Sequence, residues 1–445
     1  MRKFSALGMR VLVVSIVVTG CAPTQAGPGA ATPQATAQAA ATTGAAVVST
    51  TVPAATGGSP IKLGVMADMS GPFAPQGAEM RISTDLAVKQ WNDAGGVDGR
   101  PIQVLYVDPR SDVTQALQAA TRFVQQDHVD ALIGAVGSNE CGAVEDLVAK
   151  LGVIYITSSG CAAEEITSQT CNKYTFRFVP QGKQTVTPMA RYLVQNVGPN
   201  WGIVYPDYAF GQSQLAAFSA GLKETGGSLV VQISVPLSET NLTPYVSKLP
   251  TDGSITGVYV TLTGAQLTNA ISAMQQFGIT SKLRLTISGG KEGFGGTYPE
   301  VVNGAIFSSF SPDDKDSYMR QFTQGFSQMA QVDADAANII GGPAHASPGA
   351  QMGYSAYAAI NGLKEAMLAV HYAGPKDADK LIEALSSLRS NQSADFPGGD
   401  MIMDSNDHQG RMTQYVSQID GQREKILSTT PADQVPPIGT CKVSS

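Results

Sequence analysis

Apolar and polar residues follow one another in blocks along this chain, and the blocks predict strands that alternate with helices. Residues 61–68 form an apolar run of strand length, and residues 69–77 contain two glycines and two prolines, which favour a turn. Residues 78–91 contain neither Gly nor Pro and are compatible with a helix, and residues 102–108 form a second apolar run. A strand, a helix and a strand in this order predict a parallel sheet. Ligands of such sheets bind beyond the carboxyl ends of the strands, so the loop at residues 70–72 lies on the expected functional edge.

The same alternation continues over the rest of the chain and predicts an α/β fold. Apolar positions at helical spacing predict helices over residues 113–124, 143–151, 267–277, 357–370 and 377–388. Short apolar runs predict strands over residues 131–136, 153–156, 174–178, 201–205, 229–235, 257–260, 283–287, 306–310 and 401–403. About 385 residues follow residue 60, which is enough for two lobes with a core each.

The first 20 residues have the organisation of an export signal. Three basic residues accompany an apolar run at residues 11–18, which is too short to span a bilayer comfortably, and small residues follow it. Residues 18–21 (VTGC) resemble a lipobox, which implies diacylglyceryl transfer to the Cys21 sulfur and cleavage before Cys21. An ordinary signal peptide that is cut nearby is the alternative, and both interpretations place the mature chain outside the cytoplasm.

Residues 22–60 contain no charged residue and consist mainly of Ala, Thr, Pro, Gly and Gln. Such a composition cannot build a hydrophobic core, so we expect a disordered tether between the lipid anchor and the folded region.

The overall charge excludes one class of partner. The formal net charge is −7, and removal of residues 1–20, which carry three positive charges and no negative one, takes it to −10. An acidic chain is repelled by nucleic acid and by anionic lipid surfaces, so we expect no nucleic-acid partner.

The unit at residues 61–108 carries a more specific signal. It combines the first strand, a Ser-Gly-Pro loop at residues 70–72 and the run Asn-x-x-Gly-Gly-Val-x-Gly-Arg at residues 92–100. In this order, the unit resembles the extracytoplasmic solute-binding proteins of ABC importers, and among them the branched-chain amino-acid-binding (Leu/Ile/Val-type) family with the type I periplasmic-binding fold. The resemblance implies two Rossmann-like lobes with parallel sheets, joined by a three-strand hinge, with a ligand in the cleft between them.

The resemblance also implies that the chain crosses between the lobes three times. The expected divisions are residues 1–21 for the lipoprotein signal peptide and lipobox, 22–60 for the tether, 61–178 plus 311–404 for lobe 1, 179–310 plus 405–435 for lobe 2, and 436–445 for a C-terminal tail.

Residues 134–140 (GAVGSNE) form the first candidate ligand loop. A predicted strand ends here, two glycines allow close approach of the backbone, and Ser138 or Asn139 can cap the helix that follows. Free N–H groups and a hydroxyl at such a helix start can hold a carboxylate, although plain capping uses the same residue types. The resemblance implies that Ser138 contacts the ligand carboxylate, with Val136 and Gly137 in the same loop.

The resemblance implies further ligand contacts in a second loop and across the cleft. Ser159 and Gly160 match positions whose backbone orients the ligand, and Cys161 stands in place of the expected Thr. Three more matched positions carry Tyr in the amino-acid binders and hold Gln76, Phe210 and Thr263 here. These departures leave the identity of the solute open.

The cysteines beyond Cys21 are even in number, which in an exported chain predicts disulfides. Cys141, Cys161, Cys171 and Cys441 allow three pairings, and we expect a Cys161–Cys171 disulfide because these two close a short loop. A reactive Cys161 nucleophile is the rival interpretation, but no His lies near Cys161 in the sequence.

Motifs of enzymes and of metal sites are incomplete in this sequence. The four histidines lie far apart without metal-ligand spacing, and residues 289–291 (GGK) lack the first Gly of a phosphate loop. Residues 217–221 lack the first Gly of a nucleophile elbow, and the turn that begins at residues 404–406 lacks the bidentate Glu of a calcium loop. We therefore expect a binding protein with no catalytic residue, no cofactor and no metal.

These observations favour a monomeric, lipid-anchored receptor outside the cytoplasm. It would capture a small polar solute, such as an amino acid or a related carboxylate or amide, by hinge closure and present it to the permease subunits of an ABC importer. A ligand-binding sensor or chemoreceptor subunit with the same fold but no transporter is the alternative, and neighbouring permease and ATPase genes would distinguish the two.

Overall fold

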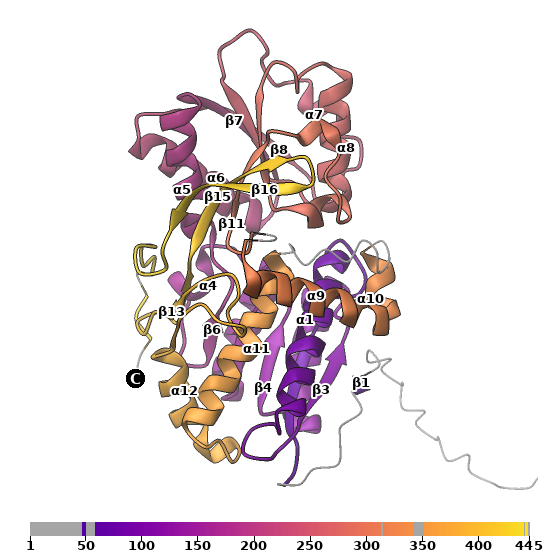
Figure 1. The fold of residues 1–445 in the computed structure, drawn as a ribbon, viewed down its shortest axis with the longest axis vertical. Helices are drawn as coiled ribbons and strands as arrows, with labels where there is room; N and C mark the ends of the chain where they lie inside the picture. The colour runs from indigo at the N-terminus through magenta and orange to yellow at the C-terminus, as the bar shows by residue number, and fades with distance from the viewer. Residues whose placement is uncertain (1–46, 50–57, 313–314, 341–350, 440, 444–445) are drawn as a thin grey trace, which may run out of the picture. The chain divides into compact units, whose positions relative to one another are not determined.

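The computed structural model describes residues 47–49, 58–312, 315–340, 351–439 and 441–443. Two mainly parallel sheets, each with its own helices, organise these residues (Figure 1). We call the part around the first sheet lobe 1 and the part around the second sheet lobe 2. The predicted signal peptide and lipobox, including Cys21, lie outside the described residues.

The sheet of lobe 1 has the strand order β1-β3-β2-β4-β5-β6. Strand β2 pairs in parallel with β3 on one side and with β4 on the other, and β5 and β6 extend the sheet in parallel. Its strands are β1 (Val48–Ser49), β2 (Ile61–Met66), β3 (Ile102–Val107), β4 (Ala131–Gly134), β5 (Ile154–Thr157) and β6 (Thr175–Arg177). Strands β4 and β5 are buried at every position, as expected of parallel strands that helices cover on both faces.

The helices of lobe 1 come from two separate parts of the chain. The first part supplies α1 (Ala74–Asp93), α2 (Val113–Arg122) with its π-helical extension η1 (Phe123–Asp127), α3 (Ser138–Leu151) and α4 (Glu165–Ser168), and the second supplies α9 (Ser317–Val332), α10 (Ala334–Ile339), α11 (Gln351–Ala369), η5 (Pro375–Asp377) and α12 (Ala378–Ser386). Helices α1 and α11 pack against each other, and the buried Trp91 on α1 donates from Nε1 to Asn361 Oδ1 on α11 at 2.9 Å. This contact joins the two parts of lobe 1 within its core.

The sheet of lobe 2 has the strand order β16-β15-β11-β10-β9-β7-β8. The strands from β11 to β8 are parallel, and β15 and β16 close one side as an antiparallel hairpin. Its strands are β7 (Asn200–Pro206), β8 (Ser228–Val235), β9 (Gly257–Val260), β10 (Arg284–Ser288), β11 (Ile306–Ser309), β15 (Gln414–Asp420) and β16 (Arg423–Thr430). The helices are α5 (Gly182–Asn196), α6 (Ala209–Glu224), α7 (Thr243–Val246) and α8 (Gly264–Gln276), with the 3₁₀ turns η2 (Lys291–Phe294) and η3 (Glu300–Val302).

Within the described residues, the chain passes between the lobes after β6, after β11 and before β15 (Figure 1). A third sheet of strands β12 (Arg389–Ser390), β13 (Met401–Met403) and β14 (Gly410–Met412) flanks the last of these crossings, because residues 404–409 connect β13 to β14. Arg177 N donates to His408 O at 2.9 Å, which joins the first crossing to the last. The predicted α/β fold with two parallel-sheet lobes and a hinge of three strands is confirmed.

Part of the predicted tether has regular structure. Val48 and Ser49 pair in antiparallel fashion with Tyr106 and Leu105 of β3. Strand β3 would otherwise be the edge of its sheet, and extended chain that lies along it satisfies some of its free N–H and C=O groups. The expectation of disorder is therefore wrong for these two residues, whereas residues 22–46 and 50–57 lie outside the described part.

The disulfide pairing also differs from the prediction. Cys141 pairs with Cys161, and Cys171 pairs with Cys441, with Cα–Cα distances of 5.8 and 5.9 Å. The predicted Cys161–Cys171 disulfide is wrong, because the fold brings the first turn of α3 to Cys161 and the C-terminal segment to Cys171. Separation along the chain measures only the entropy of closing a loop, whereas a disulfide requires Cα atoms within about 7 Å of each other.

The part of the chain that the structure describes holds neither a membrane-spanning helix nor a cluster of metal ligands. No helix there has the length and hydropathy needed to span a membrane. No group of three or more His, Cys, Asp or Glu side chains there is placed to hold a metal ion.

Candidate ligand-binding site

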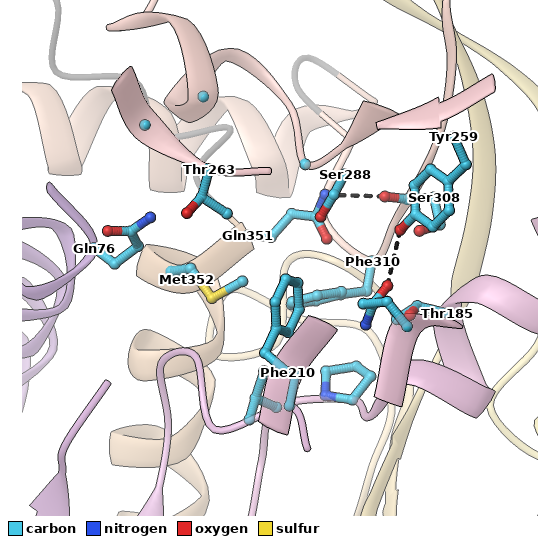
Figure 2. Close-up of a pocket in the computed structure, with 17 residues that line it drawn as sticks. Gln76, Thr185, Phe210, Tyr259, Thr263, Ser288, Ser308, Phe310, Gln351 and Met352 are labelled. Carbon is cyan, nitrogen blue, oxygen red and sulfur yellow. Dashed lines mark hydrogen bonds between the residues drawn. The ribbon is translucent and has the colours of Figure 1, made fainter. Parts of the chain in front are cut away.

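A cavity lies where the two lobes and the crossings meet, and it encloses about 690 Å³ including its opening to solvent (Figure 2). Its seventeen described lining residues are all uncharged. Lobe 1 contributes Gln76, Ala162, Gln351 and Met352; lobe 2 contributes Thr185, Phe210, Gln214, Tyr259, Thr263, Gly264, Ser288, Gly289, Gly293 and Ser308; and the crossings contribute Val179, Pro180 and Phe310. A ligand in this cavity would touch both lobes at once.

The ends of strands and the starts of helices position these side chains. Tyr259 lies on β9 and Ser288 is the last residue of β10, so both stand toward the carboxyl edge of the parallel sheet, where ligands of such sheets bind. Phe210 lies in the first turn of α6, and Thr263 is the N-cap of α8, whose side chain makes no capping hydrogen bond. The sequence therefore leaves the Thr263 hydroxyl outside the helix backbone, at the cavity wall (Figure 2).

Some polar groups of the cavity already have partners, and others do not. Tyr259 Oη donates to Gln214 Oε1 at 2.8 Å, and Gln351 Nε2 donates to Ser308 O at 3.0 Å, which links lobe 1 to lobe 2 (Figure 2). Burial raises the pKa of Tyr259 to about 12, so its hydroxyl stays protonated at neutral pH. Gln76 Oε1 is buried and has no hydrogen-bond partner among the described residues. Since a buried polar atom is costly when unpaired, Gln76 is a natural partner for a donor on a ligand.

Aromatic rings extend from the cavity into the contact between the lobes. Phe73, the N-cap of α1 in lobe 1, lies 5.9 Å from Tyr208 of lobe 2 between ring centroids, and Tyr208 lies 5.9 Å from Phe210. These distances fall in the range of favourable aromatic pairs. Phe210, at one end of this row, is therefore part of the cavity wall in lobe 2, and Phe73, at the other end, belongs to lobe 1.

Two buried carboxyl groups hold the loops behind the lobe 1 side of the cavity. Asp68 accepts from Ser111 N at 2.6 Å and from Val136 N at 3.2 Å, and Glu140 accepts from Gly137 N at 3.0 Å. Burial raises the pKa of Asp68 to about 6, and burial with repulsion from Asp68 raises the pKa of Glu140 to about 8. At neutral pH, the folded protein therefore keeps a proton on Glu140.

Three of the residues predicted to bind ligand line the cavity, namely Gln76, Phe210 and Thr263. The other six lie outside its lining. A helix starts at Ser138, as predicted, but its N-cap is Gly137 and not Ser138 or Asn139. Ser138 Oγ accepts from Ala163 N at 3.3 Å, and Val136 O accepts from Cys161 N at 2.9 Å. Gly137 caps α3, Ser159 is fully buried, Gly160 N contacts Met352 Sδ at 3.0 Å, and Cys161 forms its disulfide with Cys141.

Several lining residues were not among the predicted ones, and most had little signal in the sequence. Gln351 and Met352 begin α11, which starts after a Gly- and Pro-rich stretch, a position where a helix start can be expected. Tyr259 lies in an apolar strand, where its hydroxyl is the only polar side-chain group. Nothing in the local sequence marks Phe310 or Gln214 as part of a site.

Comparison with known proteins identifies the family. The sequence profile of the family described as periplasmic binding protein matches residues 60–424. The chain belongs to the periplasmic binding protein family. Its predicted resemblance to the branched-chain amino-acid-binding proteins is confirmed by relatives such as Leu/Ile/Val-binding protein homolog 7 of Brucella abortus (strain 2308), which is 27% identical over 210 residues. That match covers 45% of this chain and 52% of the relative, so the chain spans about half the length of the curated relatives it matches.

Solved structures of other periplasmic binding proteins share the fold over most of the chain. A solute binding protein of an ABC transporter from Rhodopseudomonas palustris BisB5, in complex with 3,4-dihydroxybenzoic acid, has a TM-score of 0.73 and 19% identity and covers 85% of this chain and 99% of its own. The leucine-, isoleucine-, valine-, threonine- and alanine-binding protein of Brucella ovis, in its closed conformation, has a TM-score of 0.71 and 20% identity, with 86% and 99% covered.

Proposed function

We propose that this chain is an extracytoplasmic receptor that captures a small solute between its lobes and delivers it to an ABC importer. The cavity carries this proposal, because its walls come from lobe 1, lobe 2 and the crossings together. A solute that bridges both walls is bound more tightly when the lobes are closed, and this difference in affinity shifts the equilibrium toward the closed state. The proposed function requires no covalent chemistry and no cofactor.

The walls favour a solute with a flat or branched apolar body and at least one hydrogen-bonding end. The rings of Phe210 and Phe310 and the thioether of Met352 offer apolar contact, whereas Thr263 and Gln76 offer hydrogen bonds. Aromatic carboxylates of the benzoate type and amino acids with apolar side chains both offer this combination. The 3,4-dihydroxybenzoic acid of the related structure from Rhodopseudomonas palustris belongs to the first class, and the amino acids named for the Brucella ovis protein, except threonine, belong to the second.

The six predicted residues outside the lining serve the site indirectly in this proposal. Ser138 holds Ala163, and Gly160 contacts Met352, so both fix segments that include the wall residues Ala162 and Met352. The export signal supports anchoring through a lipid on Cys21, and the family supports contact with permease subunits, so both belong to this proposal.

A thermal-shift screen tests the proposed function. The purified chain is heated with benzoate, 4-hydroxybenzoate, 3,4-dihydroxybenzoate, benzamide, leucine, phenylalanine and glutamate, each at several concentrations. We expect at least one aromatic carboxylate or apolar amino acid to raise the melting temperature with the concentration dependence of a single site, and glutamate to leave it unchanged. Calorimetry on each positive compound should give one site per chain. Equal melting temperatures with all compounds would contradict the proposal for these ligand classes.

A further inference from the structure

The chain does not end at the last strand of lobe 2. Residues 431–439 and 441–443 follow β16 and run toward lobe 1, and we call them the C-terminal strap. Val435 is fully buried, and its carbonyl accepts from Arg411 Nη1 at 3.2 Å. The N–H of Gly439 donates to the carboxylate of Asp407, and a side chain at position 439 would overlap that carboxylate. The strap is therefore packed on the last crossing between the lobes.

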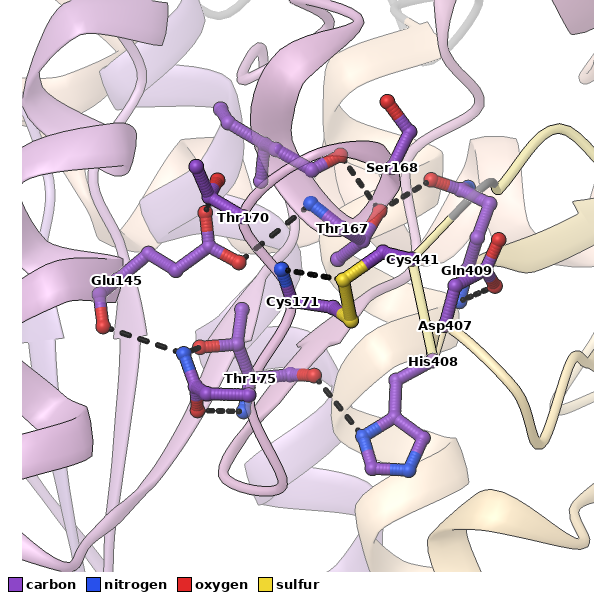
Figure 3. The surroundings of a disulfide bond; sticks show 12 residues. Glu145, Thr167, Ser168, Thr170, Cys171, Thr175, Asp407, His408, Gln409 and Cys441 are labelled. Carbon is purple, nitrogen blue, oxygen red and sulfur yellow. Dashed lines mark hydrogen bonds between the residues drawn. A yellow bond between two sulfur atoms is a disulfide. The ribbon is translucent and has the colours of Figure 1, made fainter. Parts of the chain in front are cut away.

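The far end of the strap is attached to lobe 1 and to the last crossing by backbone hydrogen bonds and by a disulfide (Figure 3). Cys441 N donates to Ser168 O at 3.0 Å, and Val443 N donates to Asn406 O at 2.7 Å. Cys441 forms its disulfide with Cys171, which lies between α4 and β6 of lobe 1. The two cysteines are 270 residues apart in sequence, and the whole of lobe 2 lies between them. The disulfide thus adds a fourth, covalent connection to the three crossings of the described chain.

The strap lies over a buried polar network that reaches the cavity. Thr167, one residue before Ser168, donates from Oγ1 to Gln409 Oε1 at 3.1 Å (Figure 3). Gln409 lies on the last crossing, is 1% exposed, and donates from Nε2 to Val179 O at 3.1 Å. Val179 is a wall residue of the cavity. One side chain therefore links the loop that the strap holds to the cavity wall.

Arg177 extends the same network to a second wall segment. This fully buried residue donates from Nε to Gln409 Oε1, and from Nη1 to Cys161 O at 3.1 Å and to Ala163 O at 2.6 Å. Ala162, between these two carbonyl groups, lines the cavity. Glu145 supports the loop from the other side, because its carboxylate accepts from Thr170 Oγ1 at 2.9 Å.

We propose that the C-terminal strap, fastened by the Cys171–Cys441 disulfide, is a brace for the hinge region that holds the loop at residues 161–171 and the last crossing at residues 404–410 in register with each other. Without the brace, the backbone segments that carry Thr167 and Gln409 can move relative to each other. The hydrogen bonds of Thr167, Gln409 and Arg177 then weaken, so both wall segments of the cavity become more mobile. The strap has this role in the chain without ligand, whichever solute the chain binds.

Hydrogen exchange of the full chain tests this proposal, with the double variant Cys171→Ser/Cys441→Ser compared with the unchanged chain. Peptides that cover residues 158–172 and 404–411 are expected to exchange about tenfold faster in the variant, because their local opening becomes easier. Peptides from β2 and β9 serve as internal controls and should exchange at equal rates in both proteins.

A second measurement does not depend on folding of the variant. Cys171 and Cys441 are partly exposed whereas Cys141 and Cys161 are buried, so mild reductant should open the Cys171–Cys441 disulfide of the folded, unchanged chain first. The same two groups of peptides should then become about tenfold faster. If faster exchange were confined to residues 431–443 in the variant and in the reduced chain, the strap would be only a fraying end and the proposal would be overturned.

Discussion

At the scale of single residues, a substitution of Phe210 tests the apolar side of the site most directly. Its ring lines the cavity from the first turn of α6 and continues the aromatic row that leads to Phe73 of lobe 1. A ring in this position supplies contact area and no charge, so its contribution depends on how much apolar surface the solute covers.

We predict that Phe210→Ala weakens binding of the solute identified by screening about tenfold to a hundredfold, which is the affinity equivalent of losing about 1.5–3 kcal/mol of apolar burial. Phe277→Ala is the matched control, because Phe277 is 52% exposed at the end of α8. Calorimetry on both variants measures the effect. An unchanged affinity in Phe210→Ala would mean that the solute lies elsewhere.

Glu140 is the residue whose protonation should be visible in the stability of the fold. Its pKa is about 8 in the folded protein, mainly because of burial, and near 4.5 when it is exposed on unfolding. Between these values the folded state holds a proton that the unfolded state has lost, so the free energy of unfolding falls as the pH rises from about 4.5 to about 8.

Glu140→Gln removes this titration, so we predict a flatter pH profile of stability and a variant that loses less stability than the unchanged chain between pH 5 and pH 8. The difference should be on the order of a few kcal/mol at most, since one pKa unit corresponds to about 1.4 kcal/mol. Urea unfolding at a series of pH values gives the profile. Glu383→Gln, on the exposed face of α12, is the control and should leave it unchanged; parallel profiles for all three proteins would refute the assignment.

At the scale of elements, the first turns of helix α1 pack tightly against the backbone that follows strand β2. Gly77 lies in its first turns, and a methyl group there would overlap the backbone carbonyl of Asp68. Gly142 lies inside α3 and has no atom within 4 Å of the same position. The two glycines are therefore alike in secondary structure and opposite in surroundings.

We predict that Gly77→Ala destabilises the protein by about 1–3 kcal/mol through overpacking, whereas Gly142→Ala stabilises it by up to about 1 kcal/mol through better helix propensity. Thermal or urea unfolding of the two variants gives the comparison. Similar changes in the free energy of unfolding of both variants would show that α1 does not pack as tightly against the backbone after β2 as described.

Most elements could be predicted because their signals are local. The apolar runs at β2, β3, β4 and β5 and the helical spacing in α11 and α12 depend only on neighbours in sequence. Helix α9 was not predicted, although its buried Met319, Phe322, Phe326 and Ala330 follow helical spacing, so the signal was present and was missed. Strand β1 could not be predicted, since two residues of an uncharged tether carry no periodicity and only the free edge of β3 makes them a strand.

At the scale of the whole molecule, the site was only partly predictable. Gln76, Phe210 and Thr263 were predicted through a family resemblance, whereas Tyr259, Phe310 and Gln351 come from strands and helix starts that only the completed fold brings together. The disulfides show the same limit, because the Cys171–Cys441 pair joins positions 270 residues apart and a preference for short loops cannot find it. Residues 441–443 belong to the predicted C-terminal tail. They are bound to lobe 1 through Cys441, whose N–H donates to Ser168 O, and the sequence carries no local signal of this contact.

The central claim is that a solute holds the two lobes together around the cavity. Small-angle scattering tests this claim most directly, with the purified chain measured alone and with a saturating amount of the compound that the thermal-shift screen identifies. Because ligand contacts to both lobes favour closure, we predict a smaller radius of gyration with the compound and no change with glutamate. A radius that stays the same while calorimetry shows one occupied site per chain would contradict hinge closure and would indicate a rigid, preformed cavity.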